Sequence, residues 1–241
     1  IGVRLVGSEM CIRDRLSDGD WLALWVGVKL AVVTTLILLV VCTPLAWWLA
    51  RRRLPGQALL EALLALPLVL PPSVLGFYLL IGLGPSGPGG WLAQWGGARS
   101  LAFSFTGLVI GSLVYSLPFV LQPLKNAFAA IEPRQLDMAA VSGARPMDRF
   151  FSLVIPQARH GYASAVILGI AHTLGEFGVV LMIGGSLAGE TRVASVALYE
   201  HVEAGDYASA HRLAAVLLVA SVLMLWALFR WQRKQNTGVM P

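Results

Sequence analysis

Long, nearly uncharged apolar stretches constrain the fold of this chain more than any other feature of its sequence. A helix that crosses a bilayer needs about 20 mostly apolar residues, because each residue advances the helix axis by about 1.5 Å. Five stretches reach this length, and we predict membrane spans over residues 22–50, 60–83, 101–124, 161–185 and 211–230. The sequence therefore predicts an all-α, polytopic membrane helix bundle with five transmembrane helices.

The low charge density excludes several other classes of protein. Charged residues make up 13% of the chain and the mean hydropathy is +0.73, whereas soluble domains carry about 25% charged residues. A soluble enzyme, a disordered chain and a nucleic-acid-binding domain are all poor matches. The net charge of +5 is better explained by the placement of Lys and Arg on one side of a membrane. We expect a lipid bilayer as a partner and no nucleic acid.

The distribution of Lys and Arg predicts an orientation. One side collects most of these residues: Arg51, Arg52, Arg53, Lys125, Arg134, Arg145, Arg149, Arg159, Arg230, Arg233 and Lys234. The inter-helix loops of the other side hold Arg99, Arg192 and Arg212. Positive residues favour the cytoplasmic side, so we expect a cytoplasmic C-terminus and, with five spans, an N-terminus outside. Arg4, Arg13 and Arg15 near the N-terminus point the other way.

The two ends of the chain differ from the membrane domain predicted over residues 16–234. Residues 1–15 are polar and unpatterned and do not begin with Met, so we expect a non-native or disordered leader. Residues 235–241 are expected to form a frayed tail. Cys11 lies in the leader and Cys42 in an apolar stretch, which implies neither a disulfide framework nor a metal cluster.

Two connections between the predicted spans carry distinctive patterns. Residues 84–97 are rich in Gly, Pro and Trp, which predicts an irregular outer loop. Residues 132–160 form a long cytoplasmic loop. Within it Pro133 suits the first turn of a helix and Gly143 suits its end. We predict a second short amphipathic turn after Pro146.

The second half of the long loop carries apolar side chains. We expect the turn after Pro146 to expose Phe150 and Phe151, and Pro156 to end it before the fourth span. Exposed apolar side chains on a charged loop need a partner or the bilayer to cover them. Two alternatives remain open on physical grounds: an ordinary surface loop lying along the membrane, or a docking element for a cytoplasmic partner.

A motif in this loop resembles the coupling motif of binding-protein-dependent ABC importer permeases. The family pattern is Glu-Ala-Ala, three residues, Gly, nine residues, then Ile-x-Leu-Pro. Here the matching positions are Asp137-Met138-Ala139, Gly143 and Leu153-Val154-Ile155-Pro156, with the spacing kept. In that family the motif forms helices that fit a cleft on the ATPase subunit. The resemblance implies ATPase-coupling roles for Asp137, Met138, Ala139, Gly143, Phe150, Phe151 and Pro156.

Two further stretches are similar to the permease subunits of molybdate ABC transporters, with sulfate and tungstate permeases as close relatives. They are LPLVLPPSVLGFYLL, residues 66–80, and LGEFGVVLMIGGSLAGETR, residues 174–192. The resemblance implies a type I ABC importer permease fold in a bacterial cytoplasmic (inner) membrane. It implies translocation of molybdate, with sulfate or tungstate as alternative cargo. An ATP-independent secondary anion transporter or channel is the alternative from another class, but we find no paired repeats or dedicated ion site.

The resemblance also implies partners. These are a second copy of the chain, two copies of a cytoplasmic ATP-binding subunit, and a soluble periplasmic or extracellular oxyanion-binding protein. The chain has no G-x-x-x-x-G-K-[ST] loop, so ATP and Mg are expected to be used by the separate ATPase. We expect no cofactor, no metal and no catalytic residue in this chain, which is a transporter subunit and not an enzyme.

Prolines interrupt the second predicted span. Pro71 and Pro72 remove backbone donors within an apolar stretch, and Ser73 follows them. A broken helix is tolerated in lipid where a water-filled cavity or neighbouring protein satisfies the backbone. The functional interpretation is a pathway-lining segment in which Ser73 donates to an oxyanion. The alternative is a simple proline kink packed against a neighbouring helix.

Glu176 is a carboxylate at membrane depth, where a charge costs about 3 kcal/mol or more. Such a group would repel an anion, so we expect a structural or gating role with bonds to backbone donors or a cation. Gly175 and Gly178 flank it and permit close backbone approach. Thr173 is the better candidate for an oxyanion contact, because its hydroxyl donates a neutral hydrogen bond. All four are candidates for residues of the translocation path.

Residues just beyond the fourth span form a third candidate group. Glu190, Thr191 and Arg192 follow a Gly-rich segment on the predicted outer side. They are interpreted either as a capped turn or as a rim that contacts the binding protein or admits anions. Arg192 suits a bidentate oxyanion contact.

Overall fold

Helices form every regular element in the described part of the chain. The structure, a computed structural model, describes residues 16–52, 55–95, 97 and 99–236. Within these ranges there is no β-strand, which confirms the predicted all-α class. The predictions for the leader 1–15, for Cys11 and for the tail beyond residue 236 lie outside the described residues. Cys42 is buried with a free thiol.

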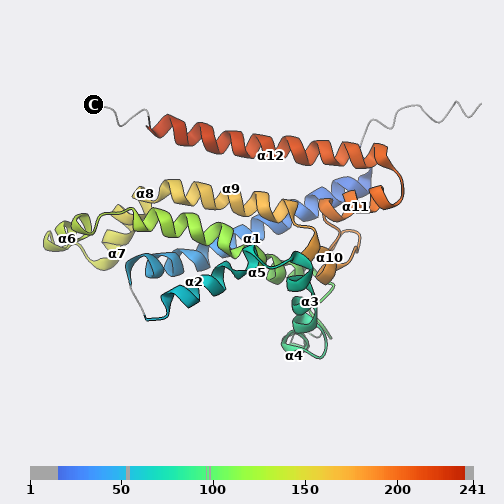
Figure 1. The fold of residues 1–241 in the computed structure, drawn as a ribbon, viewed down its shortest axis with the longest axis horizontal. Helices are drawn as coiled ribbons and strands as arrows, with labels where there is room; N and C mark the ends of the chain where they lie inside the picture. Colours follow the sequence, from blue (N-terminus) through green and yellow to red (C-terminus); the bar gives the residue numbers. More distant parts are fainter. Residues whose placement is uncertain (1–15, 53–54, 96, 98, 237–241) are drawn as a thin grey trace, which may run out of the picture.

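Three long helices pack side by side at the centre of the molecule: α1 (Asp18–Arg51), α5 (Phe105–Ala129) and α9 (Arg159–Gly175) (Figure 1). Ser17 starts α1 with a capping box, in which its hydroxyl accepts from the backbone N–H of Asp20. Glycines allow the close packing, since a Cβ on Gly169 would lie 2.9 Å from Val120. These contacts join the first, third and fourth predicted spans into one core.

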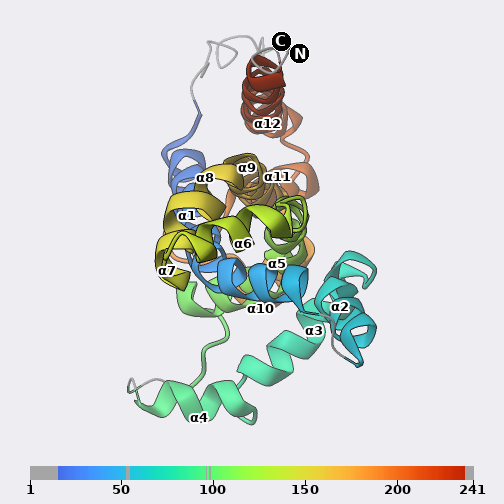
Figure 2. The ribbon, with the colours of Figure 1, turned by 90° about the vertical axis from the view of Figure 1, so that its left-hand side faces the viewer.

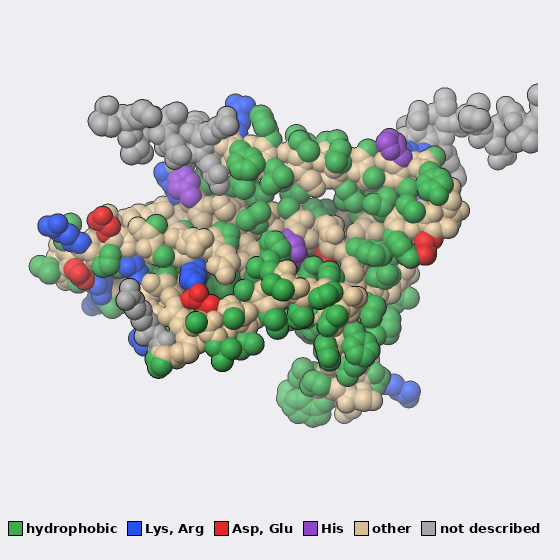
Figure 3. All heavy atoms as spheres, viewed as in Figure 1, with side chains coloured by type: hydrophobic (Ala, Val, Ile, Leu, Met, Phe, Trp, Pro, Cys, Tyr) green, Lys and Arg blue, Asp and Glu red, His purple; other side chains and the backbone are tan. Residues whose placement is uncertain are grey.

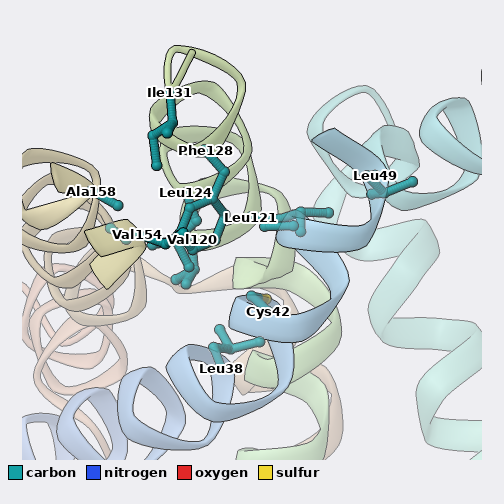
Figure 4. Packing of buried hydrophobic residues seen from close by; sticks show 12 residues of the cluster. Leu38, Cys42, Leu49, Val120, Leu121, Leu124, Phe128, Ile131, Val154 and Ala158 are labelled. Carbon is teal, nitrogen blue, oxygen red and sulfur yellow. The ribbon is translucent and has the colours of Figure 1, made fainter. Parts of the chain in front are cut away.

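The core between these helices is apolar and fully buried at one end of the bundle. Figure 4 shows Leu38 and Cys42 of α1 facing Val120 and Leu124 of α5. Val154, from the second half of the long loop, belongs to the same cluster. Burial of such side chains contributes about 1.5–3 kcal/mol each, so the long loop is anchored to the same core as the spans.

Two of the predicted spans are broken. The second consists of α2 (Gln57–Ala65), the 3-10 turn η1 (Leu66–Leu68) and α3 (Pro72–Leu83), with a bend of 102°. The fourth consists of α9 and α10 (Gly178–Gly184), with a bend of 60°. Among the described residues, three helices are long and apolar enough to cross a membrane alone, and up to five spans result when each bent pair counts as one. This agrees with the five spans predicted.

The last helix lies apart from the others along one side of the bundle. It is α12 (Tyr207–Asn236), preceded by the short α11 (Ala194–Glu203). Large apolar side chains of α12 remain exposed, among them Leu218, Val222, Trp226 and Phe229. Figure 3 shows apolar side chains over the length of the molecule, with charged ones gathered at the end near α6 and α7. This distribution is typical of a membrane protein whose charged loop projects into water.

The long loop of residues 132–160 is mostly helical. It contains α6 (Pro133–Val141), α7 (Pro146–Arg149), the π-helical turn η2 (Phe150–Val154) and α8 (Ile155–Gln157). As predicted, α6 begins at Pro133 and the chain turns at Gly143, whose φ is +86°. The predicted turn after Pro146 is also present. Pro156 lies inside α8, so the element ends after it at Ala158.

The prediction of an irregular outer loop over residues 84–97 is wrong. Residues Pro88–Trp95 form the helix α4, which projects from the bundle beyond α3 (Figure 2). Pro88 presets the first turn of this helix. Trp91 and Trp95 lie one turn apart, with ring centroids separated by 5.1 Å, and this contact stabilises a helix whose composition alone suggests turns.

Candidate functional site

The break in the fourth span places a carboxyl group inside the bundle. α9 ends at Gly175, and Glu176 has an extended backbone with φ −68° and ψ 123°. Its side chain is 3% exposed, and Oε2 accepts a hydrogen bond of 2.9 Å from the hydroxyl of Ser112 in α5. Oε1 has no partner among the described residues. We expected the carboxyl of Glu176 to bond to backbone donors or to a cation. Among the described residues its partner is instead the hydroxyl of Ser112.

Further polar side chains lie beside this contact. The hydroxyl of Ser116, one turn along α5 from Ser112, lies 3.0 Å from that of Thr173 and 2.9 Å from Nδ1 of His172. The imidazole of His172 stacks on the ring of Phe119 at 3.7 Å. We name the group formed by Ser112, Ser116, His172, Thr173 and Glu176 the polar cluster. It joins α5 to α9 by hydrogen bonds that replace water at this depth.

Thr173 is engaged within the polar cluster. Its side chain is 3% exposed and its hydroxyl is bonded to Ser116, so no free donor faces an aqueous path in this conformation. Contact of Thr173 with an oxyanion therefore stays a prediction. The cluster holds one carboxyl group, and among the described residues no group of His, Cys, Asp or Glu side chains is arranged to hold a metal ion.

A second element reaches the break from the end of the molecule opposite α6 (Figure 1). Ser195, in the first turn of α11, donates a hydrogen bond of 2.6 Å to the backbone carbonyl of Glu176. The break interrupts the regular helical hydrogen bonds, and Ser195 supplies a donor at this point. Sequence reasoning missed Ser112, Ser116 and Ser195. The four-residue spacing of Ser112 and Ser116 on an apolar helix was an available signal, whereas Ser195 carried none.

The two breaks touch each other. A Cβ on Gly178, at the start of α10, would lie 2.8 Å from Cβ of Pro72 at the start of α3. Gly76 of α3 is equally close to Met182 of α10. Gly175, by contrast, has no neighbour within 4 Å of such a Cβ, so the close approach expected at both flanking glycines occurs at Gly178 alone.

The proline break is exposed. Pro71, Pro72 and Ser73 are exposed at the start of α3, and the hydroxyl of Ser73 bonds to none of the described residues. A free hydroxyl on a helix N-terminus is a suitable donor for an anion. The geometry is compatible with the predicted pathway-lining role, which stays a prediction.

The residues proposed for an outer rim have structural partners. Thr191 is buried; its hydroxyl donates to the carbonyl of Gly184 at 2.6 Å and accepts from the N–H of Leu187 at 3.1 Å. Arg192 pairs with Glu200 of α11, with Nε 2.7 Å from Oε2. Glu190 is exposed beside a small cavity lined by residues including Lys29. Thr191 therefore stabilises a turn, as one of the two alternatives predicted.

The coupling-motif residues divide into outward-facing and inward-facing positions. Asp137, Met138 and Gly143 are exposed on and after α6, and Ala139 is half-buried. Phe151 is 59% exposed, and Pro156 is exposed as well. These positions form a surface on the loop.

Phe150 departs from the prediction of an exposed side chain. Its ring packs against Trp47 of α1 at 5.7 Å and against Phe128 of α5 at 6.4 Å. A π-helical turn changes the direction of successive side chains relative to an α-helix, and η2 begins at this residue. Phe150 therefore anchors the loop, and Phe151 alone points outward.

The chain is similar to known proteins in sequence and in fold. Residues 42–235 match the family described as "Binding-protein-dependent transport system inner membrane component". This match covers most of the chain, including the loop with the coupling motif. The chain belongs to the family of binding-protein-dependent transport system inner membrane components. It is therefore a permease subunit of a membrane transport system.

Individual members of this family are similar in sequence to this chain. The chain is 53% identical over 218 residues to the molybdenum transport system permease protein ModB of Azotobacter vinelandii, covering 90% of this chain and 96% of the relative. It is 32% identical to ModB of Escherichia coli K12, covering 87% and 92%. It is also 32% identical to the sulfate transport system permease protein CysT of Escherichia coli K12, covering 81% and 70%. The resemblance to molybdate ABC permeases is confirmed.

Solved structures share the fold of this family member. A chain of a bacterial alginate ABC transporter, crystallised in complex with an alginate pentasaccharide-bound periplasmic protein, aligns with a TM-score of 0.71. The alignment covers 90% of this chain and 80% of the other, at 16% sequence identity. This similarity confirms the ABC importer permease fold.

Proposed function

We propose that this chain is the membrane-spanning permease subunit of an ABC importer that translocates molybdate across the bacterial inner membrane. The observation that carries this proposal is the 53% identity to a molybdenum permease over nearly the full length of both chains. The sulfate permease relative is 32% identical and is covered over only 70% of its length. Molybdate is therefore favoured over sulfate, and tungstate is the alternative of closest chemistry.

The energy for transport comes from a separate subunit in this proposal. Two copies of the chain form the pathway, and two cytoplasmic ATPase subunits use ATP and Mg. This chain itself binds no cofactor. The exposed side chains of Asp137, Met138 and Phe151 provide a surface for the ATPase. The C-terminus and the 132–160 loop lie in the cytoplasm, and the N-terminus lies outside.

A soluble oxyanion-binding protein delivers the anion to the outer mouth. The related alginate transporter was crystallised with a periplasmic protein, which supports a partner of this type. The outer end of the chain includes α11 with Glu190, Thr191 and Arg192 near its start. Arg192 is paired with Glu200, so its contact with an anion requires that this pair opens.

The pathway runs beside the two breaks. Ser73, at the exposed break, is a hydroxyl donor that lines the path in this proposal. Glu176 is buried and bonded to Ser112, so it supports the broken helix and does not contact the anion. This division avoids placing a carboxylate against a dianion, which would be repulsive.

Uptake by proteoliposomes tests this function. The permease is reconstituted with the ATPase and binding protein of the same transport system, and uptake of radiolabelled molybdate is measured with ATP inside. We expect ATP-dependent uptake that tungstate inhibits more strongly than sulfate. Stronger inhibition by sulfate would make the chain a sulfate permease, and uptake without the ATPase subunit would make it a secondary transporter or channel.

A further inference from the structure

The cytoplasmic end of α1 is bonded to the turn that leads into the coupling loop. Nη2 of Arg51 donates hydrogen bonds to the carbonyls of Phe128 at 3.2 Å and Ile131 at 2.8 Å. These carbonyls belong to the last turn of α5 and the residues just after it, where carbonyls lack donors within the helix. A cation at a helix C-terminus also interacts favourably with the helix dipole. Arg51 thus closes the end of α5 directly before α6.

The side chain one turn earlier on α1 contacts the other end of the loop. The ring of Trp47 lies under the guanidinium of Arg51, 4.8 Å from it, and meets Phe128 edge-on at 5.6 Å. The same ring meets Phe150, the first residue of η2, at 5.7 Å. Trp47 and Arg51 together therefore hold both the entry to the loop segment 132–149 and its exit.

Membrane topology alone does not explain Arg51. The next residue, Arg52, carries the same charge at the same depth, and both count equally for the side on which the segment lies. Yet the side chain of Arg52 is exposed and bonds to none of the described residues, whereas Arg51 is half-buried with two carbonyl acceptors. Both bonds leave the same nitrogen, Nη2, and the guanidinium lies over the ring of Trp47. Stacking on an aromatic face is typical of the planar guanidinium, whereas the lysine ammonium is a compact point charge.

We propose that Arg51 is a positioning residue that transmits movement of the coupling loop to α1. This inference rests on the proposed function, in which α6 contacts the ATPase. A push on α6 moves the turn at Phe128–Ile131, and the two hydrogen bonds carry that displacement into α1. The helix α1, which has 34 residues and Pro44 inside it, reaches about 50 Å and packs against both α5 and α9. The movement therefore reaches the helices that hold the polar cluster.

Matched arginine variants test the proposal in the complete complex of permease, ATPase and binding protein. Arg51→Ala removes the two bonds, and Arg52→Ala removes an equal charge that has no such partner. We expect Arg51→Ala to retain bound ATPase while molybdate uptake per ATP hydrolysed falls about tenfold, as the loss of bonds to a charged group implies. Arg52→Ala should stay within about twofold of the wild type, as for a surface substitution. Arg51→Lys should fall between the two.

Equal uptake per ATP in Arg51→Ala and Arg52→Ala would overturn the inference. If Arg51→Ala does not assemble, Arg51→Lys decides, and a wild-type ratio in that variant overturns it as well. A wild-type complex that takes up no molybdate contradicts the proposed function instead.

In every case amide hydrogen exchange provides a readout that is independent of the cargo. We expect ATP to alter exchange in α6 and in α1 of the wild type, and in α6 alone of the Arg51 variants. Retention of the α1 response in those variants would also overturn the inference.

Discussion

The two broken spans differ in what produces the break. Between η1 and α3 the chain carries Pro71 and Pro72, it bends by 102°, and the residues at the start of α3 are exposed. Between α9 and α10 there is no proline, the bend is 60°, and Glu176 is buried with bonds from Ser112 and Ser195. The first break follows from the covalent structure of proline. The second depends on side chains supplied by other helices.

This difference suggests different freedoms of movement. A break caused by proline persists in any arrangement of the neighbouring helices, because the missing N–H cannot be restored. A break held by hydrogen bonds can change when those bonds change. The two breaks meet at Gly178 and Pro72. A change of backbone position at the second break therefore displaces the residues of the first. We therefore expect the stability of the protein to respond strongly at the second break and weakly at the first.

The largest effect is expected from Ser112→Ala. Among the described residues, Ser112 is the one side-chain partner of the buried carboxyl of Glu176, and this change removes it. A buried carboxyl left without a partner costs about 3 kcal/mol. Ser73→Ala is the control at the first break, where the hydroxyl is exposed, and should cost less than about 0.5 kcal/mol. Thermal unfolding in detergent measures both. Equal losses in the two variants would remove the distinction between the breaks.

The sequence predicts the proline break and not the other one, for a physical reason. Proline acts on its own neighbours, so Pro71 and Pro72 reveal a break at once. The bend at Glu176 involves Ser112, which lies 64 positions away, and Ser195, 19 positions away. No local pattern encodes these distances, and residues 161–185 therefore look like one span.

The coupling loop shows the same limit. Pro133 and Gly143 mark the ends of α6 correctly, because the first presets φ and the second adopts a positive φ of +86°. The prediction that the side chain of Phe150 is exposed was wrong, because its direction depends on a π-helical turn and on the ring of Trp47. Local backbone chemistry was predictable, whereas contacts between distant elements were not.

The contact between the two breaks predicts a smaller effect. Gly178→Ala brings a Cβ to 2.8 Å from Cβ of Pro72, and overpacking of this kind costs about 2 kcal/mol. Gly175→Ala is the matched control on the other side of Glu176, where no neighbour lies within 4 Å. We expect that variant to unfold at or above the wild-type temperature, because alanine favours a helix over glycine. If Gly178→Ala unfolds at as high a temperature as Gly175→Ala, then the two breaks are not in close steric contact.

The smallest effect concerns the bond from α11 to the second break. Ser195→Ala removes the hydroxyl that donates to the carbonyl of Glu176, and a single hydrogen bond of this kind contributes about 1 kcal/mol. Ser221→Ala is the control, because Ser221 is exposed and donates to the carbonyl of Leu217 within its own helix. Thermal unfolding should show a lower midpoint for Ser195→Ala than for Ser221→Ala, and equal midpoints would contradict the role of α11.

The double variant Ser112→Ala/Ser195→Ala extends this measurement. Both serines restrain the same residue, one through its side chain and one through its backbone. Groups that act on a common partner are not independent, and their joint loss differs from the sum of the single losses by more than about 0.5 kcal/mol. We expect the double variant to lose less than that sum, because once one bond is absent the break relaxes and the other holds less. A strictly additive result would mean that α5 and α11 stabilise the break independently of each other.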